Sequence, residues 1–172
     1  VAVIEVLQQQ IAKVEKRLQE RVAPEDDFKR LMTVPGIGTV LATMIYLETG
    51  PIDRFASPGN YASYARCVNS EYSSNGKKKG QGNTKNGNKY LSWAFVEAAH
   101  FATRFCPEAK RFYERKKAKA NTALATKALA HKLARACYHI LKEQEPFDMS
   151  RCFAWPMTKT GRVNNGTGTK PS

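Results

Sequence analysis

Residues 28–50, FKRLMTVPGIGTVLATMIYLETG, contain two short apolar stretches of helical character separated by Pro35-Gly36-Ile37-Gly38. Pro35 ends the first stretch, and the two glycines allow the tight turn that begins the second. The pattern predicts a helix-hairpin-helix over residues 28–49. A plain helical turn that serves only packing is the alternative.

The turn glycines suggest a chemical role as well as a conformational one. In a helix-hairpin-helix they expose backbone amides at a helix N-terminus, where a nucleic-acid phosphate is held without sequence preference. Gly36 and Gly38 are therefore candidate nucleic-acid-binding residues.

The segment upstream of this motif has the periodicity of a coiled coil. Apolar residues recur at alternating spacings of three and four from Ile4 to Leu18, and Arg21 occupies the next seam position. Gln, Glu, Lys and Arg fill most of the other positions, which favours a connector or dimer helix over residues 1–23. A helix packed on its own domain fits the same pattern. Pro24 ends this helix.

The rest of the chain also predicts helices. Ser57-Pro58 is a typical helix start, and residues 91–143 contain three helical stretches separated near Cys106-Pro107 and Asn121. The last stretch has one apolar stripe, formed by Leu124, Ala128, Leu129, Leu133, Ala136, Cys137, Ile140 and Leu141. No segment predicts a strand, so we expect an all-α domain over residues 24–155. Residues 156–172, rich in Gly, Asn and Thr, predict a disordered tail.

Residues 71–90, EYSSNGKKKGQGNTKNGNKY, interrupt the helical pattern and predict a polar loop. The loop contains five lysines between Ser73 and Lys89, and the chain has no acidic residue between Tyr72 and Val96. Glycine, asparagine, serine and threonine add donors that suit phosphate. A solvated surface loop is the alternative, but the charge of the whole chain favours contact with a nucleic-acid backbone.

That charge is +13, from 28 Lys and Arg against 15 Asp and Glu, which points to polyanionic partners. No stretch approaches the roughly 18 apolar residues of a membrane-spanning helix, so we expect nucleic acid rather than a membrane. The cysteines and histidines lack metal-ligand spacing. We therefore expect no metal site in this chain, and the dispersed cysteines favour a reducing cytoplasm. The expected location is the bacterial cytoplasm, in association with the nucleoid.

Several of these motifs, in the same order, resemble the C-terminal domain of the DEDD insertion-sequence transposases, which are bridge-RNA-guided serine recombinases. The matching segments are LMTVPGIGTVLATMIYLETGPIDRF, SPGNYASYARCV and SSNGKKKGQGNTKNGNKYL, followed by an alanine-rich helix. The resemblance covers residues 28–153, and residues 90–148 are most similar to the branch with subterminal inverted repeats.

The resemblance implies that this chain is one part of a larger recombinase. The family's serine precedes a glycine-rich turn with lysine, and the matching run here is Ser74-Asn75-Gly76-Lys77, with Asn75 in place of glycine. Ser74 is thus the expected nucleophile and Ser73 its rival. The later element, Lys85-Asn86-Gly87-Asn88-Lys89, would be a phosphate clamp. The expected nucleic-acid contacts in and beyond the turn are Lys77, Lys78, Lys79, Lys85, Asn88, Lys89, Arg111, Arg115 and Lys119.

The resemblance also implies partners that lie outside this chain. The Mg²⁺ ligands belong to an N-terminal RuvC-like domain, so we expect no cofactor in this chain and no cleavage by it alone. The expected partners are DNA, a guide (bridge) RNA and further copies in a homodimer or tetramer, but no membrane. A non-catalytic helix-hairpin-helix module that binds DNA or RNA is the alternative function.

Overall fold

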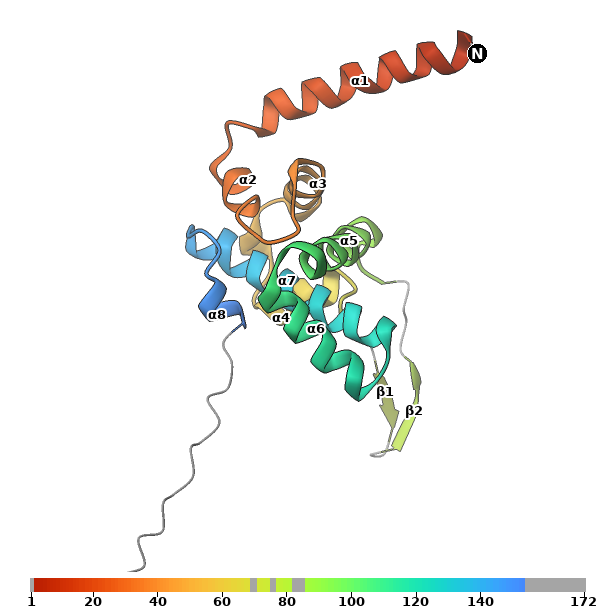
Figure 1. Ribbon diagram of the computed structural model, residues 1–172, viewed down its shortest axis with the longest axis vertical. Coiled ribbons are helices and arrows are strands. Elements are labelled where there is room, and N and C mark those ends of the chain that lie inside the picture. Colours follow the sequence, from red (N-terminus) through yellow and green to blue (C-terminus); the bar gives the residue numbers. More distant parts are fainter. Residues whose placement is uncertain (1, 69–70, 75–76, 82–85, 154–172) are drawn as a thin grey trace, which may run out of the picture.

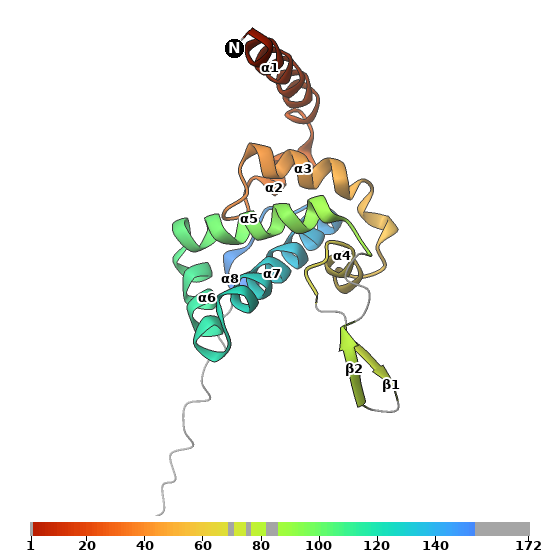
Figure 2. The same ribbon diagram turned by 90° about the vertical axis from the view of Figure 1, so that its right-hand side faces the viewer.

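Helix α7 (Thr122–Glu143) is the centre of the fold in the computed structural model, which describes residues 2–68, 71–74, 77–81 and 86–153. Helices α4 (Pro58–Tyr64), α5 (Lys89–Phe105) and α6 (Pro107–Lys119) pack around it (Figures 1 and 2). The remaining elements are α1 (Ala2–Val22), α2 (Asp26–Leu31), α3 (Thr39–Thr49), η1 (Ile52–Arg54), β1 (Glu71–Ser74), β2 (Lys77–Gln81) and α8 (Met149–Phe153). The predicted all-α class is confirmed.

The apolar stripe of α7 forms much of the core because neighbouring helices cover it from several sides. Leu129, Leu133 and Cys137 are fully buried, and alanines between them allow close approach of the neighbouring helices. Leu124 was expected in this stripe, but its side chain is 45% exposed. It lies in the first turn of α7, N-terminal to Ala125, where burial begins.

Two polar contacts cross this core. The hydroxyls of Thr49 and Tyr61, both fully buried, lie 2.8 Å apart, and Tyr138 donates a hydrogen bond to the Phe55 carbonyl at 3.1 Å. Burial is the main cause that raises the pKa of Tyr61 well above its ordinary value. Because buried hydroxyls are costly without a partner, the first bond holds α3 to α4, and the second holds α7 to the end of η1.

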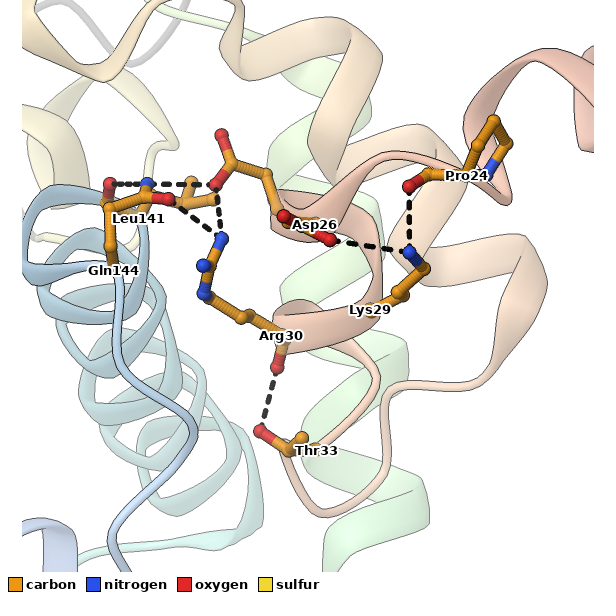
Figure 3. A network of polar contacts seen from close by, with 8 residues as sticks. Pro24, Asp26, Lys29, Arg30, Thr33, Leu141 and Gln144 are labelled. Carbon is orange, nitrogen blue, oxygen red and sulfur yellow. Dashed lines mark hydrogen bonds and ion pairs between the residues drawn. The ribbon is translucent and has the colours of Figure 1, made fainter.

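A polar network fixes α2 to the C-terminal end of α7 (Figure 3). Arg30 Nη1 donates to Gln144 Oε1 at 2.7 Å, and Gln144 Nε2 donates to Asp27 Oδ1 at 2.8 Å. Arg30 also pairs with Asp27 at 3.3 Å. Gln144 has a left-handed backbone (φ 59°) where α7 ends, which directs the chain back toward α2.

Helix α1 projects away from this body (Figure 1). Val22, at its end, is buried, and Lys29 Nζ donates to the Pro24 carbonyl at 2.7 Å in the following connection. The apolar seam along the helix is exposed, from 61% at Ile4 to 37% at Leu18. The helix is confirmed, whereas its pairing in a coiled coil stays a prediction.

Residues 71–74 and 77–81 form a two-stranded antiparallel hairpin where a loop was expected. Glu71 pairs with Gln81 and Ser74 with Lys77, and a register shift lies between Tyr72 and Ser73. The prediction relied on alternating apolar residues, which a strand needs only when one of its faces is buried. This hairpin extends beyond the helices in both views, and its sequence lacks that alternation.

Within the described ranges, no helix is both long enough and apolar enough to span a membrane.

Candidate nucleic-acid interface

The Pro35–Gly38 turn connects α2 to α3 and lies against α5. Val34 and Ile37 are buried on either side of Gly36, whose backbone is left-handed (φ 85°). A Cβ at Gly36 would lie 2.3 Å from the Ala98 carbonyl oxygen and 2.6 Å from the Ala102 amide nitrogen. The structure therefore gives Gly36 a packing role: only a residue without a side chain fits between the turn and α5.

Gly38 lies in a different environment, although it is only two residues away. It is exposed, precedes the first residue of α3, and has open space where a side chain would be. No side chain caps this helix end. The first amides of α3 thus lie beside an exposed, unobstructed residue, which is the arrangement that phosphate binding requires.

Gly87 and Asn88 join the hairpin to the helical body. Gly87 has φ 95°, and a Cβ there would lie 2.4 Å from the Tyr64 carbonyl oxygen. The same carbonyl accepts a 2.7 Å hydrogen bond from the Asn88 amide, and Arg66 donates to the Gly87 carbonyl at 2.8 and 3.1 Å. The segment just before α5 is therefore held against the end of α4.

The Asn88 side chain completes this joint. Its Oδ1 caps α5 by accepting from the amides of Tyr90 (2.8 Å) and Leu91 (3.0 Å), and its Nδ2 donates to Glu48 Oε2 at 2.6 Å. Two side-chain hydrogen bonds lower the pKa of Tyr64: the one with Asn88 has the larger effect, and the one with Arg54 the smaller. Asn88, expected to contact phosphate, is thus used here to connect α3, α4 and α5.

The joint residues Glu48, Tyr64 and Arg66 were not among the sequence-based candidates. Glu48 is 40 positions from Asn88, and no periodic pattern connects the two. The only available signal was the glycine-asparagine pair itself, which is typical of a constrained turn before a helix.

The hairpin brings the expected nucleophile and three lysines into one pairing unit. Ser74 is opposite Lys77 and Ser73 is opposite Lys78, while Lys79 lies on the same strand. Lys85 lies outside the described residues, and Lys89 is the first, exposed residue of α5. The backbone register therefore places both candidate serines beside basic residues.

Helix α6 carries the remaining expected contacts. Arg111 is paired with Glu108 at 2.9 Å, and the guanidinium of Arg115 lies 5.6 Å from the centre of the Phe112 ring. Lys119 is exposed in the last turn of the helix. The expected cations are thus spread over α5, α6 and the hairpin rather than gathered into a single cluster.

Throughout the described part of the chain, no group of three His, Cys, Asp or Glu side chains is placed to hold a metal ion. The four cysteines are free. Burial raises the pKa of the Cys67 thiol to about 12 and that of Cys152 to about 11.

This chain is similar to known proteins over the region that contains this interface. The family model described as "Transposase IS116/IS110/IS902 family" matches residues 28–114. The "Transposase for insertion sequence element IS1328" of Yersinia enterocolitica is 31% identical over 91 residues, 53% of this chain and 27% of that protein. The "Probable family 20 transposase" of Pseudomonas aeruginosa is 25% identical over 103 residues, 60% of this chain and 30% of its own length. The match thus spans less than a third of either relative.

Proposed function

Because this chain belongs to the IS116/IS110/IS902 transposase family, we propose that it is the nucleophile-bearing part of a DNA transposase. The region that matches the family contains the β1–β2 hairpin, with Ser73 and Ser74 paired opposite Lys78 and Lys77. This placement of serines among lysines, within the matched region, is the observation that carries the proposal.

The chemistry that follows is transesterification. The Ser74 hydroxyl oxygen bonds to phosphorus, and one deoxyribose oxygen leaves with a proton. The resulting phosphoserine link keeps the energy of the broken bond, so a second DNA hydroxyl reverses the exchange and joins a new strand. Lysines beside the serine offset the charge that develops on the phosphoryl oxygens.

Metal-binding carboxylates would complete the site from a part of the protein outside this chain. We place them in an N-terminal RuvC-like domain, as the resemblance implies. Mg²⁺ bound there would neutralise phosphoryl oxygens and activate the hydroxyl. The present chain contributes the serine and holds the hairpin in place through the Gly87–Asn88 joint.

The nucleic-acid interface around the serine has three parts. In this proposal, the exposed start of α3 acts as the phosphate-binding end of a helix-hairpin-helix, the hairpin lysines contact the cleaved strand, and α6 contacts DNA or a bridge RNA. The subterminal-repeat branch and RNA guidance both belong to this proposal. Residues 24–155 form the transposase domain, and residues 1–23 form the connector.

The proposal also includes an oligomer that forms through helix α1. Its seam residues are more than half exposed from Ile4 to Val14, and burying them removes apolar surface from water. A second copy of α1 provides the complementary seam, which gives a homodimer, or a tetramer of two such pairs.

The decisive experiment uses the full-length parent protein with its RNA, Mg²⁺ and a nicked suicide DNA substrate. A protein–DNA adduct on a denaturing gel is expected for wild type and for Ser63→Ala, a control on α4, and is lost in Ser74→Ala. Loss only in Ser73→Ala keeps the mechanism and moves the nucleophile by one residue. Absence of any wild-type adduct, with DNA binding intact, favours the non-catalytic binding module.

A further inference from the structure

A cavity of about 540 Å³ lies between α6, α7 and α8, away from the hairpin and the α3 turn. One face of α7 from Ala128 to Glu143 forms its floor, and Phe112 of α6 and Phe147 of the following loop contribute aromatic rings. Its volume falls within the range of about 300–1,000 Å³ that is usual for ligand sites. None of the sequence-based site candidates lines this cavity.

The two ends of the cavity differ in charge. Toward the C-terminal end of α7, Glu143 is paired with Arg151 and accepts from His139 at 2.7 Å, while Asp148 caps α8. The carboxylates at that end, apart from the exposed Glu145, are thus already engaged.

The other end is cationic. It is lined by Lys116, Lys132 and Arg135, for which no carboxylate lies within ion-pair distance in the described ranges. Lys132 Nζ lies 5.3 Å from the centre of the Phe112 ring and 5.7 Å from that of Phe153, and Lys116 Nζ lies 5.7 Å from Phe112. Two ammonium groups thus lie beside aromatic rings at this end of the cavity.

The aromatic rings and the cations of this cavity together suit one class of ligand. A nucleotide combines a flat aromatic base, which stacks on aromatic rings or packs on apolar surface, with a phosphate that needs cations. We propose that this cavity receives a single unpaired nucleotide of the bound DNA or RNA, with its base against Phe112 and its phosphate beside Lys132 and Arg135. This inference rests on the proposed nucleic-acid-binding function and is independent of the serine.

His131 fits the same site. It lines the cavity next to Lys132, and burial, together with the charges of Arg135 and Lys132, lowers its pKa. The neutral imidazole has one donor and one acceptor, which suits the edge of a base. A base reaches such a site only when it is unstacked, so the site discriminates unpaired strands from duplex.

The test measures the affinity of the whole chain for labelled oligothymidylate, oligouridylate and a DNA duplex by fluorescence anisotropy. Lys132→Gln and Arg135→Gln are expected to weaken single-strand binding about tenfold and duplex binding less than about twofold, if each removes one phosphate contact. Phe112→Leu, which keeps an apolar side chain, is expected to weaken single-strand binding by a similar factor. The matched control is Lys127→Gln, on α7 but outside the cavity, which lowers both affinities equally.

The outcomes separate the inference from the proposed function. A selective loss with both single strands supports the site, and a loss confined to one of them supports it and identifies DNA or RNA as the source. Equal losses for single strands and duplex overturn the inference and leave a general basic surface. Unchanged affinities for all three probes also overturn it and favour a protein ligand. If wild type binds none of the probes, the inference and the proposed nucleic-acid function both fall.

Discussion

Replacing Gly36 with alanine tests whether the turn before α3 is a packing element. The new Cβ would lie 2.3 Å from the Ala98 oxygen and 2.6 Å from the Ala102 nitrogen, both backbone atoms of α5. No side-chain rotation relieves such contacts, so the turn and α5 must move apart.

The expected cost has two parts. The left-handed backbone (φ 85°) costs alanine about 1–2 kcal/mol, and overpacking typically adds about 1–3 kcal/mol. The less flexible unfolded chain offsets about 0.4–1 kcal/mol of this loss. We expect a net decrease of about 1–4 kcal/mol in the free energy of unfolding, which lowers Tm by about 2–4 °C per kcal/mol.

The assay is thermal and urea unfolding followed by circular dichroism, with Gly38→Ala as the matched control. Gly38 has φ −93° and open space around it, so its replacement costs at most about 1 kcal/mol through a weaker helix cap. Gly38→Ala is instead expected to weaken duplex binding, because its methyl group stands beside the first amides of α3. Equal stability of Gly36→Ala and wild type would refute the packing role.

Three further predictions follow from buried and paired groups. Thr49→Val leaves the buried Tyr61 hydroxyl without its partner and is expected to lower the free energy of unfolding by about 1–3 kcal/mol. In a double-mutant cycle, adding Tyr61→Phe should recover part of that loss, and strict additivity of the two changes would contradict the contact. The hydrogen bond from Arg151 lowers the pKa of Glu143 from 4.5 to about 2. This pair therefore stabilises the fold above pH 4.5, and its contribution disappears as pH falls toward about 2. In urea titrations, Arg151→Gln should reduce the loss of unfolding free energy over that pH range. Because the Cys67 thiol has its pKa raised to about 12, its alkylation in the native chain should be much slower than in the urea-unfolded chain, and equal rates would show that the site is open.

The helices could be predicted because their signals are local. The seam of α1 is periodic, and Ser57 caps α4 by accepting from the Asn60 amide at 3.2 Å, as its position before Pro58 indicated. Burial was less predictable, because periodicity shows which residues share a face but not whether that face is covered. Phe101 has the spacing of a core residue in α5, yet its side chain is 41% exposed.

In the candidate site, too, the local features could be predicted from sequence, whereas the contacts between distant segments could not. The turn glycines were found from sequence, but their separate roles depend on where α5 lies, which no local pattern gives. The Gly87–Asn88 joint depends on contacts with Tyr64 and Glu48, more than 20 positions away. The hairpin escaped prediction because its strands lack the alternating apolar residues of a half-buried strand, and the cavity did so because three helices form it.

The length of α1 has a consequence for the distance between two copies of the helical body in a dimer. Its 21 residues rise about 32 Å, and the helical body is attached at one end only. If two copies pair in parallel along the exposed seam, both bodies lie at the same end and reach a common site. If they pair antiparallel, α1 holds the bodies about 30 Å apart, close to the 34 Å of one duplex turn. The direction of pairing in a single helix thus decides whether the two bodies are attached at the same end of the helix pair or at opposite ends of it, about 30 Å apart.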